Sequence, residues 1–183
     1  MSAHQELINW RAVAGDDIEF AYIKATEGGD FVDRRFAENW RLAGHAGLDR
    51  GAYHFFTLCT DGAAQAANFL RVASPEPGAL APAVDLELVG NCKRRPSPAE
   101  LDTELSRFLS IIEDAWHTKA VLYVGDEFER RYPARERLGR PLWHRRFLRR
   151  PNVKGWTIWQ LHGYARISGI DGGVDLNVMR ASP

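Results

Sequence analysis

Residues 79–87 read Ala79-Leu80-Ala81-Pro82-Ala83-Val84-Asp85-Leu86-Glu87, an uncharged run that ends in two carboxylates. The run follows the turn signal Pro75-Glu76-Pro77-Gly78, which favours a buried strand after the turn. Side chains alternate faces along a strand, so Asp85 and Glu87 are predicted to point the same way, about 6.5–7 Å apart. Taken alone, the pair also fits a solvated acidic turn. Because burial beside a second carboxylate disfavours both charges, a pair at a strand end indicates chemistry more than fold stability.

Strand-forming stretches alternate with helix signals on both sides of this run. Strands are predicted at 19–25, 51–56, 79–87 and 120–124. Helices are predicted between them, with Asp33 capping the first, Asp61 capping the second and the capping box 97–100 opening the third. Such strand–helix repeats imply parallel pairing of the strands.

The pattern changes after a short helical or turn segment near 126–131. Three strand candidates then follow without a long helix between them, at 141–143, 155–160 and 173–178. We therefore predict an α/β fold whose last strands complete a barrel. A chain of 183 residues with 45% hydrophobic content suffices for one core, so we expect residues 1–183 to form a single domain.

Polar or phenolic side chains lie at or near most of the predicted strand ends. In a barrel of parallel strands, functional side chains gather at the carboxyl ends of the strands. The residues concerned are Glu27, Tyr53, Asp85, Glu87, Tyr123, Gln160 and Asp175. Their positions predict one polar site at the mouth of the barrel.

Six segments, in order along almost the whole chain, resemble the glycoside hydrolase family 25 lysozymes, muramidases that cleave bacterial peptidoglycan. The segments are 20–28, 51–56, 84–87, 122–123, 159–160 and 174–177. The resemblance implies a modified TIM-like barrel of the type (β/α)5(β)3 that forms one catalytic domain. It also implies hydrolysis of the β-1,4 bond between N-acetylmuramic acid and N-acetylglucosamine, in a site that needs no cofactor.

The resemblance also assigns roles to individual residues. Glu87 matches the general acid, and Asp85 would stabilise positive charge on the sugar or orient its acetamido group, with covalent and water-mediated alternatives open. Partial burial beside a carboxylate is expected to keep Glu87 protonated while Asp85 stays ionised. Asp175 would be a further acidic member of the site. The sugar would be positioned by Tyr53, Tyr123, Gln160 and, unless it belongs to a capped turn, Glu27.

The first residues depart from the family pattern. Family members begin with Asp-Val-Ser, and here Met1 falls at the valine while the aspartate has no counterpart. We therefore expect a truncated first strand, with marginal stability, self-association or another segment in the gap as consequences. The alternative function is a catalytically impaired relative that binds peptidoglycan without cleaving it.

Charge and composition limit the classes of partner that the chain is expected to bind. The net charge is zero, but nine arginines crowd between Arg130 and Arg150, either as a solvated rim or as a surface that attracts an anionic polymer such as a cell-wall glycan. No nucleic-acid motif accompanies them. No apolar run is long enough to cross a bilayer, and no export signal is visible, although the implied substrate places the protein outside the cytoplasm or in the periplasm. The sequence predicts no oligomeric state.

The cysteines and histidines do not predict a metal site. Cys59 and Cys92 lack metal-ligand spacing, and a single bridge between them stays open as an interpretation. The six histidines form no ligand pair, and His54, which lies between aromatic residues, is expected in the core. The six tryptophans are expected to be mostly core residues, although some could stack on sugar rings.

Overall fold

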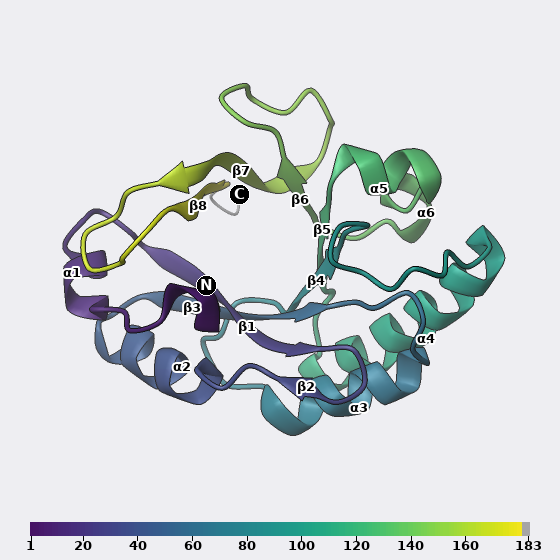
Figure 1. Cartoon of the computed structure of the whole chain (residues 1–183), viewed down its shortest axis with the longest axis horizontal. Helices are drawn as coiled ribbons and strands as arrows, with labels where there is room; N and C mark the ends of the chain where they lie inside the picture. The colour runs from purple at the N-terminus through teal and green to yellow at the C-terminus, as the bar shows by residue number, and fades with distance from the viewer. Residues whose placement is uncertain (181–183) are drawn as a thin grey trace.

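The computed structural model describes residues 1–180, which are built around one curled sheet of eight strands (Figure 1). The strands lie in the order β2-β1-β3-β4-β5-β6-β7-β8. Strands β1 and β3 to β7 pair in parallel, whereas β2 and β8 pair antiparallel at the two ends. The strand bounds are β1 Phe20–Glu27, β2 Phe31–Val32, β3 Asp49–Phe55, β4 Ala83–Leu86, β5 Val121–Val124, β6 Leu142–Arg145, β7 Trp156–Ala165 and β8 Val174–Met179.

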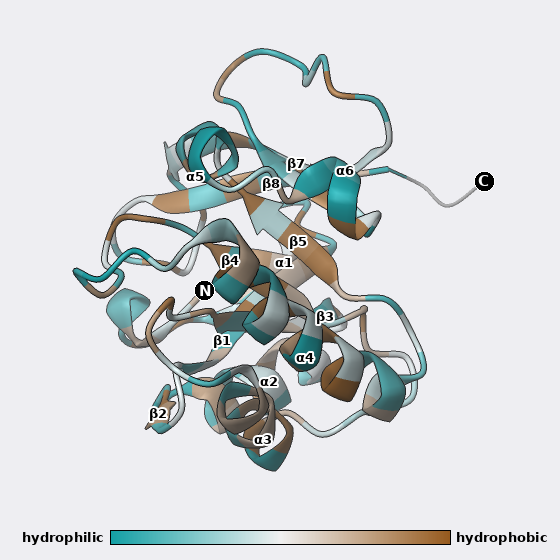
Figure 2. Ribbon diagram, turned by 90° about the vertical axis from the view of Figure 1, so that its right-hand side faces the viewer, coloured by the Kyte–Doolittle hydropathy of each residue, from teal (hydrophilic) through white to brown (hydrophobic). Residues whose placement is uncertain are grey.

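Helices cover one side of the sheet and connect its parallel strands. Helices α2, α3 and α4 lie together beneath the sheet in Figure 1, where their apolar residues join the main core. Figure 2 shows β5 as largely hydrophobic and α4 as a mixture of hydrophilic and hydrophobic residues, as expected for a helix with one buried face. The helix bounds are η1 Ala3–Gln5 (a 3₁₀ helix), α1 Trp10–Ala14, α2 Phe36–His45, α3 Gly62–Val72, α4 Pro98–Trp116, α5 Asp126–Arg131 and α6 Arg135–Leu138. None of these helices combines the length and apolarity needed to cross a membrane.

Local sequence signals explain where the main helices begin. The Asp61 side chain accepts a hydrogen bond from the backbone N–H of Ala64, and Ser97 and Glu100 form the predicted capping box of α4. Asp33 acts differently from the prediction. Its two carboxylate oxygens accept the backbone N–H groups of Ala3 and Arg35, each at 2.8 Å, so Asp33 joins the start of the chain to the start of α2.

The sheet is a half-barrel. In residues 1–180 no strand pairing joins β8 to β1 or β2, so the predicted closing strands curl around the cavity without completing a ring of hydrogen bonds. The alternation of strands and helices agrees with the prediction. The sequence did not predict the short elements η1, α1, β2 and α6 or the extension of β7 to Ala165.

Met1 lies against the edge of β1 that β3 leaves free. Its amino nitrogen donates to the carbonyl oxygen of Tyr22 at 2.7 Å, and its carbonyl oxygen accepts the backbone N–H of Lys24 at 2.7 Å. These two hydrogen bonds give the backbone of β1 a partner at the position where the sequence predicted a truncated strand.

His54 is a buried core histidine, as predicted. Its ring lies within hydrogen-bond distance of the Thr26 hydroxyl (2.7 Å) and the Gln65 side-chain oxygen (3.1 Å), and it stacks on Phe108. Burial lowers the pKa of His54 to about 4, so the ring is neutral at physiological pH. It belongs to the helix-facing side of the sheet and does not line the cavity described below.

Cys59 and Cys92 form a disulfide that joins the loop after β3 to the loop after β4, 33 residues apart in sequence. A crosslink of this span is expected to stabilise the fold by about 3–4 kcal/mol, mainly by restricting the unfolded chain.

Thermal unfolding of the Cys59→Ser/Cys92→Ser double variant is therefore expected to show a clearly lower Tm than the oxidised protein. Adding reductant should lower the Tm of the parent chain and leave that of the double variant unchanged. Equal Tm values in all four samples would contradict the prediction.

Candidate active site

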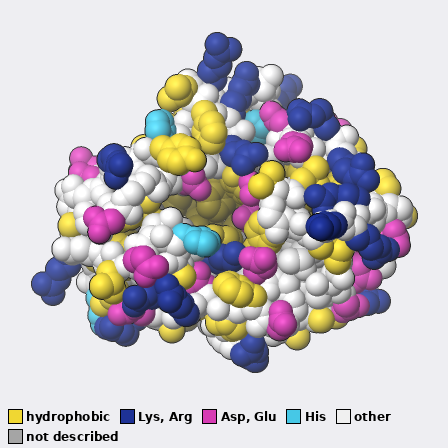
Figure 3. Space-filling view, in the orientation of Figure 1, with side chains coloured by type: hydrophobic (Ala, Val, Ile, Leu, Met, Phe, Trp, Pro, Cys, Tyr) yellow, Lys and Arg dark blue, Asp and Glu magenta, His cyan; other side chains and the backbone are white. Residues whose placement is uncertain are grey.

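A cavity of about 780 Å³ lies along the inner face of the sheet and includes residues at the carboxyl ends of β4, β5 and β6. Figure 3 shows it as a hollow in the middle of one face, with acidic side chains at its rim. The cavity collects residues from most strands of the sheet, as the strand-end argument predicted. Six of the seven predicted site residues line it: Tyr53, Asp85, Glu87, Tyr123, Gln160 and Asp175.

Glu27 is the predicted site residue that does not line the cavity. Its carboxylate pairs with the ammonium group of Lys24 at 2.6 Å, and its backbone pairs with Phe31 of β2. Lys24 in turn lies over the rings of Phe31 and Phe55. The predicted contact of Glu27 with substrate therefore has no counterpart among the cavity-lining side chains.

Asp85 is the most enclosed carboxylate of the site. Its backbone carbonyl accepts the N–H of Phe56 at 3.0 Å, but its Oδ1 atom is buried without a hydrogen-bond partner in the described part of the chain. Burial raises the pKa of Asp85 well above its usual range, and the nearby Glu87 adds to the effect. Lys24 and Arg145 oppose the shift through their positive charges.

Glu87 follows the last residue of β4 and is held from two directions. Its backbone carbonyl accepts a hydrogen bond from the Asn91 side chain at 3.1 Å, and Asn91 also donates to the carbonyl of Phe56. Its carboxylate forms an ion pair with Arg145, with 2.8 Å between Oε1 and Nη1. Burial raises the pKa of Glu87, while Arg145 and the hydroxyl of Tyr123 oppose that rise.

The ion pair bears on where the proton of the carboxylate pair lies. Two carboxylates in one buried site favour the binding of a single proton. Asp85 is more enclosed than Glu87, and Arg145 favours the ionised form of Glu87. Burial therefore favours the proton on Asp85 while Arg145 favours the charge on Glu87, the opposite direction to the division expected from the sequence. The local sequence around Glu87 contains no sign of the Arg145 cation, which comes from β6.

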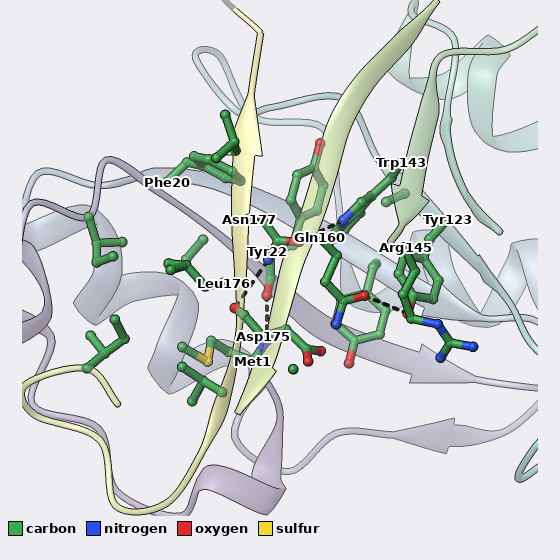
Figure 4. A pocket seen from close by; sticks show the side chains of 18 of the residues that line it. Met1, Phe20, Tyr22, Tyr123, Trp143, Arg145, Gln160, Asp175, Leu176 and Asn177 are labelled. Atoms are coloured by element: carbon green, nitrogen blue, oxygen red, sulfur yellow. Dashed lines mark hydrogen bonds between the residues drawn. The ribbon is translucent and has the colours of Figure 1, made fainter. Parts of the chain in front are cut away.

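Polar and aromatic groups surround the carboxylates on the remaining walls. The Tyr123 hydroxyl donates to the side-chain oxygen of Gln160 at 2.8 Å, and the Trp143 indole N–H donates to the side-chain oxygen of Asn177 at 2.8 Å. Figure 4 shows Tyr123 and Arg145 on one side of Gln160 and Asp175 on the other. Burial also raises the pKa of Asp175. The cavity therefore combines carboxylates with amides and aromatic faces, a combination suited to sugars.

Trp143, Arg145 and Asn177 are among the cavity residues that the predicted site did not include. Trp143 and Asn177 lie in stretches that were identified as strands, and Asn177 ends one of the family-like segments. Arg145 lies two residues after Trp143 on β6, so strand alternation places both side chains on the same face. The alternation of side chains along β6 was the signal that could have identified Arg145 as a site residue. The many arginines around Arg145 obscured that signal.

The arginine-rich segment is neither a uniform solvated rim nor an unpaired basic surface. Several of its guanidinium groups form ion pairs with carboxylates on other elements or nearby turns. The pairs are Arg135 with Asp126 and Glu129, Arg137 with Asp102, Arg140 with Glu113, and Arg145 with Glu87. Within residues 1–180, no group of three or more His, Cys, Asp or Glu side chains is arranged to hold a metal ion.

The comparisons with known proteins agree with this geometry. The sequence model of the family described as Glycosyl hydrolases family 25 matches residues 1–170. The chain belongs to glycosyl hydrolase family 25. A solved family 25 glycosyl hydrolase from Bacillus anthracis superposes with a TM-score of 0.91 at 32% identity, covering 100% of this chain and 87% of that one.

Two curated relatives align with this family 25 chain over its full length. Protein YegX of Escherichia coli K12 is 34% identical over 190 residues, which cover 100% of this chain and 68% of YegX. Lysozyme M1 of Streptomyces globisporus is 30% identical over 211 residues, which cover 100% of this chain and 67% of the lysozyme. Family membership confirms the predicted fold class and the predicted enzyme class, a glycosidase of the lysozyme type that hydrolyses peptidoglycan.

Proposed function

We propose that this family 25 enzyme cleaves the β-1,4 bond between N-acetylmuramic acid and N-acetylglucosamine, with Glu87 as the general acid. The observation that carries the proposal is the pair Asp85 and Glu87 in the wall of a 780 Å³ cavity at the carboxyl ends of parallel strands. Burial raises the pKa of both carboxyl groups, which suits a site that must hold a proton near neutral pH.

The proposed reaction uses the two carboxyl groups in different ways. Glu87 gives its proton to the glycosidic oxygen as the bond from that oxygen to the anomeric carbon of N-acetylmuramic acid breaks. Asp85, as a carboxylate, stabilises the positive charge that develops on the sugar, either directly or by orienting the acetamido group. Water then adds its oxygen to the anomeric carbon, and its remaining proton returns to Glu87. The cycle requires the proton of the pair to move from Asp85 to Glu87 before the bond breaks.

The other cavity residues are proposed to position the sugar. Tyr53 and Tyr123 offer hydroxyl groups, and Gln160 and Asn177 offer amides, at the cavity wall. Trp143 offers an indole ring, the surface on which sugar rings stack. Asp175 faces the same space from β8 and adds negative charge opposite Glu87. Together these groups support binding of a neutral, hydroxyl-rich glycan strand.

The place of action is proposed to be outside the cytoplasm, in the extracellular space or the periplasm. Peptidoglycan, the substrate of this enzyme class, lies outside the cytoplasmic membrane. The disulfide between Cys59 and Cys92 supports an oxidising compartment, because such bonds are rare in cytosolic proteins.

The proposal is tested on purified peptidoglycan sacculi. The protein is expected to lower the turbidity of the suspension and to release soluble fragments. Co-sedimentation in the same samples measures binding separately from cleavage. Binding without release of fragments would replace the proposal by the alternative of a peptidoglycan-binding relative. Neither binding nor release would contradict both.

A further inference from the structure

The ion pair between Arg145 and Glu87 is a feature that the proposed reaction does not use. Arg145 comes from β6 and Glu87 from the end of β4, 58 residues apart in sequence, and both side chains line the cavity. The two side chains are 36% and 24% exposed, so water screens the pair only in part. A guanidinium at 2.8 Å from a carboxylate oxygen holds that carboxylate in place and favours its ionised form.

The neighbouring backbone leaves room for this guanidinium. Gly125 follows β5, and a Cβ atom added there would lie 3.0 Å from Nη2 of Arg145 and 3.5 Å from its Cζ. The φ angle of Gly125 is −76°, which any residue adopts. The backbone conformation therefore does not require glycine at this position, whereas the guanidinium occupies the space that a side chain would fill.

The charges around Glu87 are otherwise mostly negative. Asp85 lies two residues earlier, on β4, while Glu127 on α5 and Asp175 on β8 both act on Glu87 through their negative charges. Tyr123 on β5 contributes a hydroxyl group. Asp175 and Glu127 favour the protonated form of Glu87, and Arg145 opposes them with its positive charge.

We propose that Arg145 is a positioning residue that orients the Glu87 carboxyl group and tunes its readiness to donate a proton to the glycosidic oxygen. The inference rests on the proposed role of Glu87 as the general acid. The ion pair must loosen before Glu87 takes up the proton that it turns toward the substrate. Arg145 therefore sets the upper pH limit of the reaction without taking part in bond breaking itself.

The first test measures the Glu87 carboxyl group directly, by ¹³C NMR titration in the full chain, with the signal assigned through Glu87→Gln. Arg145→Met removes the cation, so the titration midpoint of Glu87 is expected to rise by about one pH unit or more. Arg145→Lys keeps the charge and should retain most of the parent midpoint. Gly125→Ala crowds the guanidinium and should move the midpoint in the same direction as Arg145→Met, but less.

The matched control is Arg146→Met. Arg146 is the next residue in the chain, and its guanidinium donates to the Asn152 side chain at 2.7 Å instead of to a site carboxylate. The same loss of charge and length at this position should leave the Glu87 midpoint unchanged. An equal rise in both methionine variants would show a general loss of positive charge and would overturn the proposal. So would an unchanged midpoint in folded Arg145→Met or, if that variant does not fold, in Gly125→Ala.

The second test follows the pH dependence of kcat/KM on soluble glycan strands. A general acid acts while protonated, so the alkaline limb of the Arg145→Met profile is expected to move upward with the NMR midpoint. A higher KM with an unmoved alkaline limb would make Arg145 a substrate contact and would contradict the proposal. If the parent chain cleaves no glycan, the proposed function fails, whereas the NMR titration still decides the role of Arg145.

Discussion

Glu87→Gln is expected to lower peptidoglycan hydrolysis by about 10²–10⁴-fold, because the amide keeps the size of the side chain but has no proton to give to the glycosidic oxygen. The backbone hydrogen bond from Asn91 to residue 87 does not involve the side chain, so the variant should fold like the parent chain. Release of soluble fragments from sacculi measures the activity, and circular dichroism measures the fold.

The control for this prediction is Glu136→Gln. Glu136 is exposed on α6 and does not line the cavity, so the same change of carboxylate to amide should leave activity unchanged. Near-parent activity in Glu87→Gln would remove Glu87 from the role of general acid. Equal losses in the two variants would show that the effect is not specific to the cavity.

Asp85→Asn is expected to lower activity by about a hundredfold or more and, at neutral pH, to raise the Tm by a few degrees. The activity falls because the site loses the negative charge proposed to face the developing positive charge of the sugar. The Tm rises because the variant no longer buries an ionisable carboxyl group whose charge both burial and the neighbouring Glu87 disfavour. An activity loss with higher stability is the signature of a residue kept for function.

The pH dependence of stability gives Asp85→Asn a second measurement. The pKa of Asp85 is raised in the fold above the value of 3.8 for a free side chain, so the folded state holds the proton more tightly. Its contribution to the free energy of unfolding is present below pH 3.8 and is lost as pH rises through the raised pKa. The stability gain of Asp85→Asn over the parent chain should therefore grow with pH.

The pKa of His54 is shifted in the opposite direction to that of Asp85, so His54 also makes stability depend on pH. Comparing the variant with the parent chain cancels the contribution of His54. Its pKa is lowered to about 4 from 6.5, so its contribution to stability is full above pH 6.5 and falls as pH drops toward 4. This contribution is common to the parent chain and the variant. As a control, Asp171→Asn makes the same change at an exposed aspartate outside the cavity, and its stability is measured against the parent chain over the same pH range. A pH-independent difference between Asp85→Asn and the parent chain would contradict the buried-charge account.

The fold was largely predictable where the signals are local. The helix caps at Asp61 and Ser97 each depend on a single side chain that is visible in the sequence. The main strands are predicted by apolar runs that lie between turn signals. Strand β2 and helix α1 are too short to show a period in the sequence. The half-barrel depends on how β8 lies relative to β1, a tertiary arrangement that no local pattern encodes.

The site was predictable where strand ends and family-like segments coincide, as for Asp85, Glu87 and Asp175. Glu27 has the same kind of position in the sequence, but its ion pair with Lys24 keeps its carboxylate outside the cavity lining. Arg145 shows the opposite failure, since a residue in a basic run turned out to contact the proposed general acid. Both differences concern charge partners, which the local sequence pattern does not show.

The reducing ends that the enzyme creates in peptidoglycan identify the bond that it cleaves. Sacculi digested by the parent chain are reduced with borohydride, and the fragments are analysed by mass spectrometry, with Glu87→Gln as the parallel sample. The account predicts reduced N-acetylmuramic acid as the new terminal residue in the parent digest and almost none in the Glu87→Gln digest. Reduced N-acetylglucosamine at the new ends, or equal amounts of product from both proteins, would contradict it.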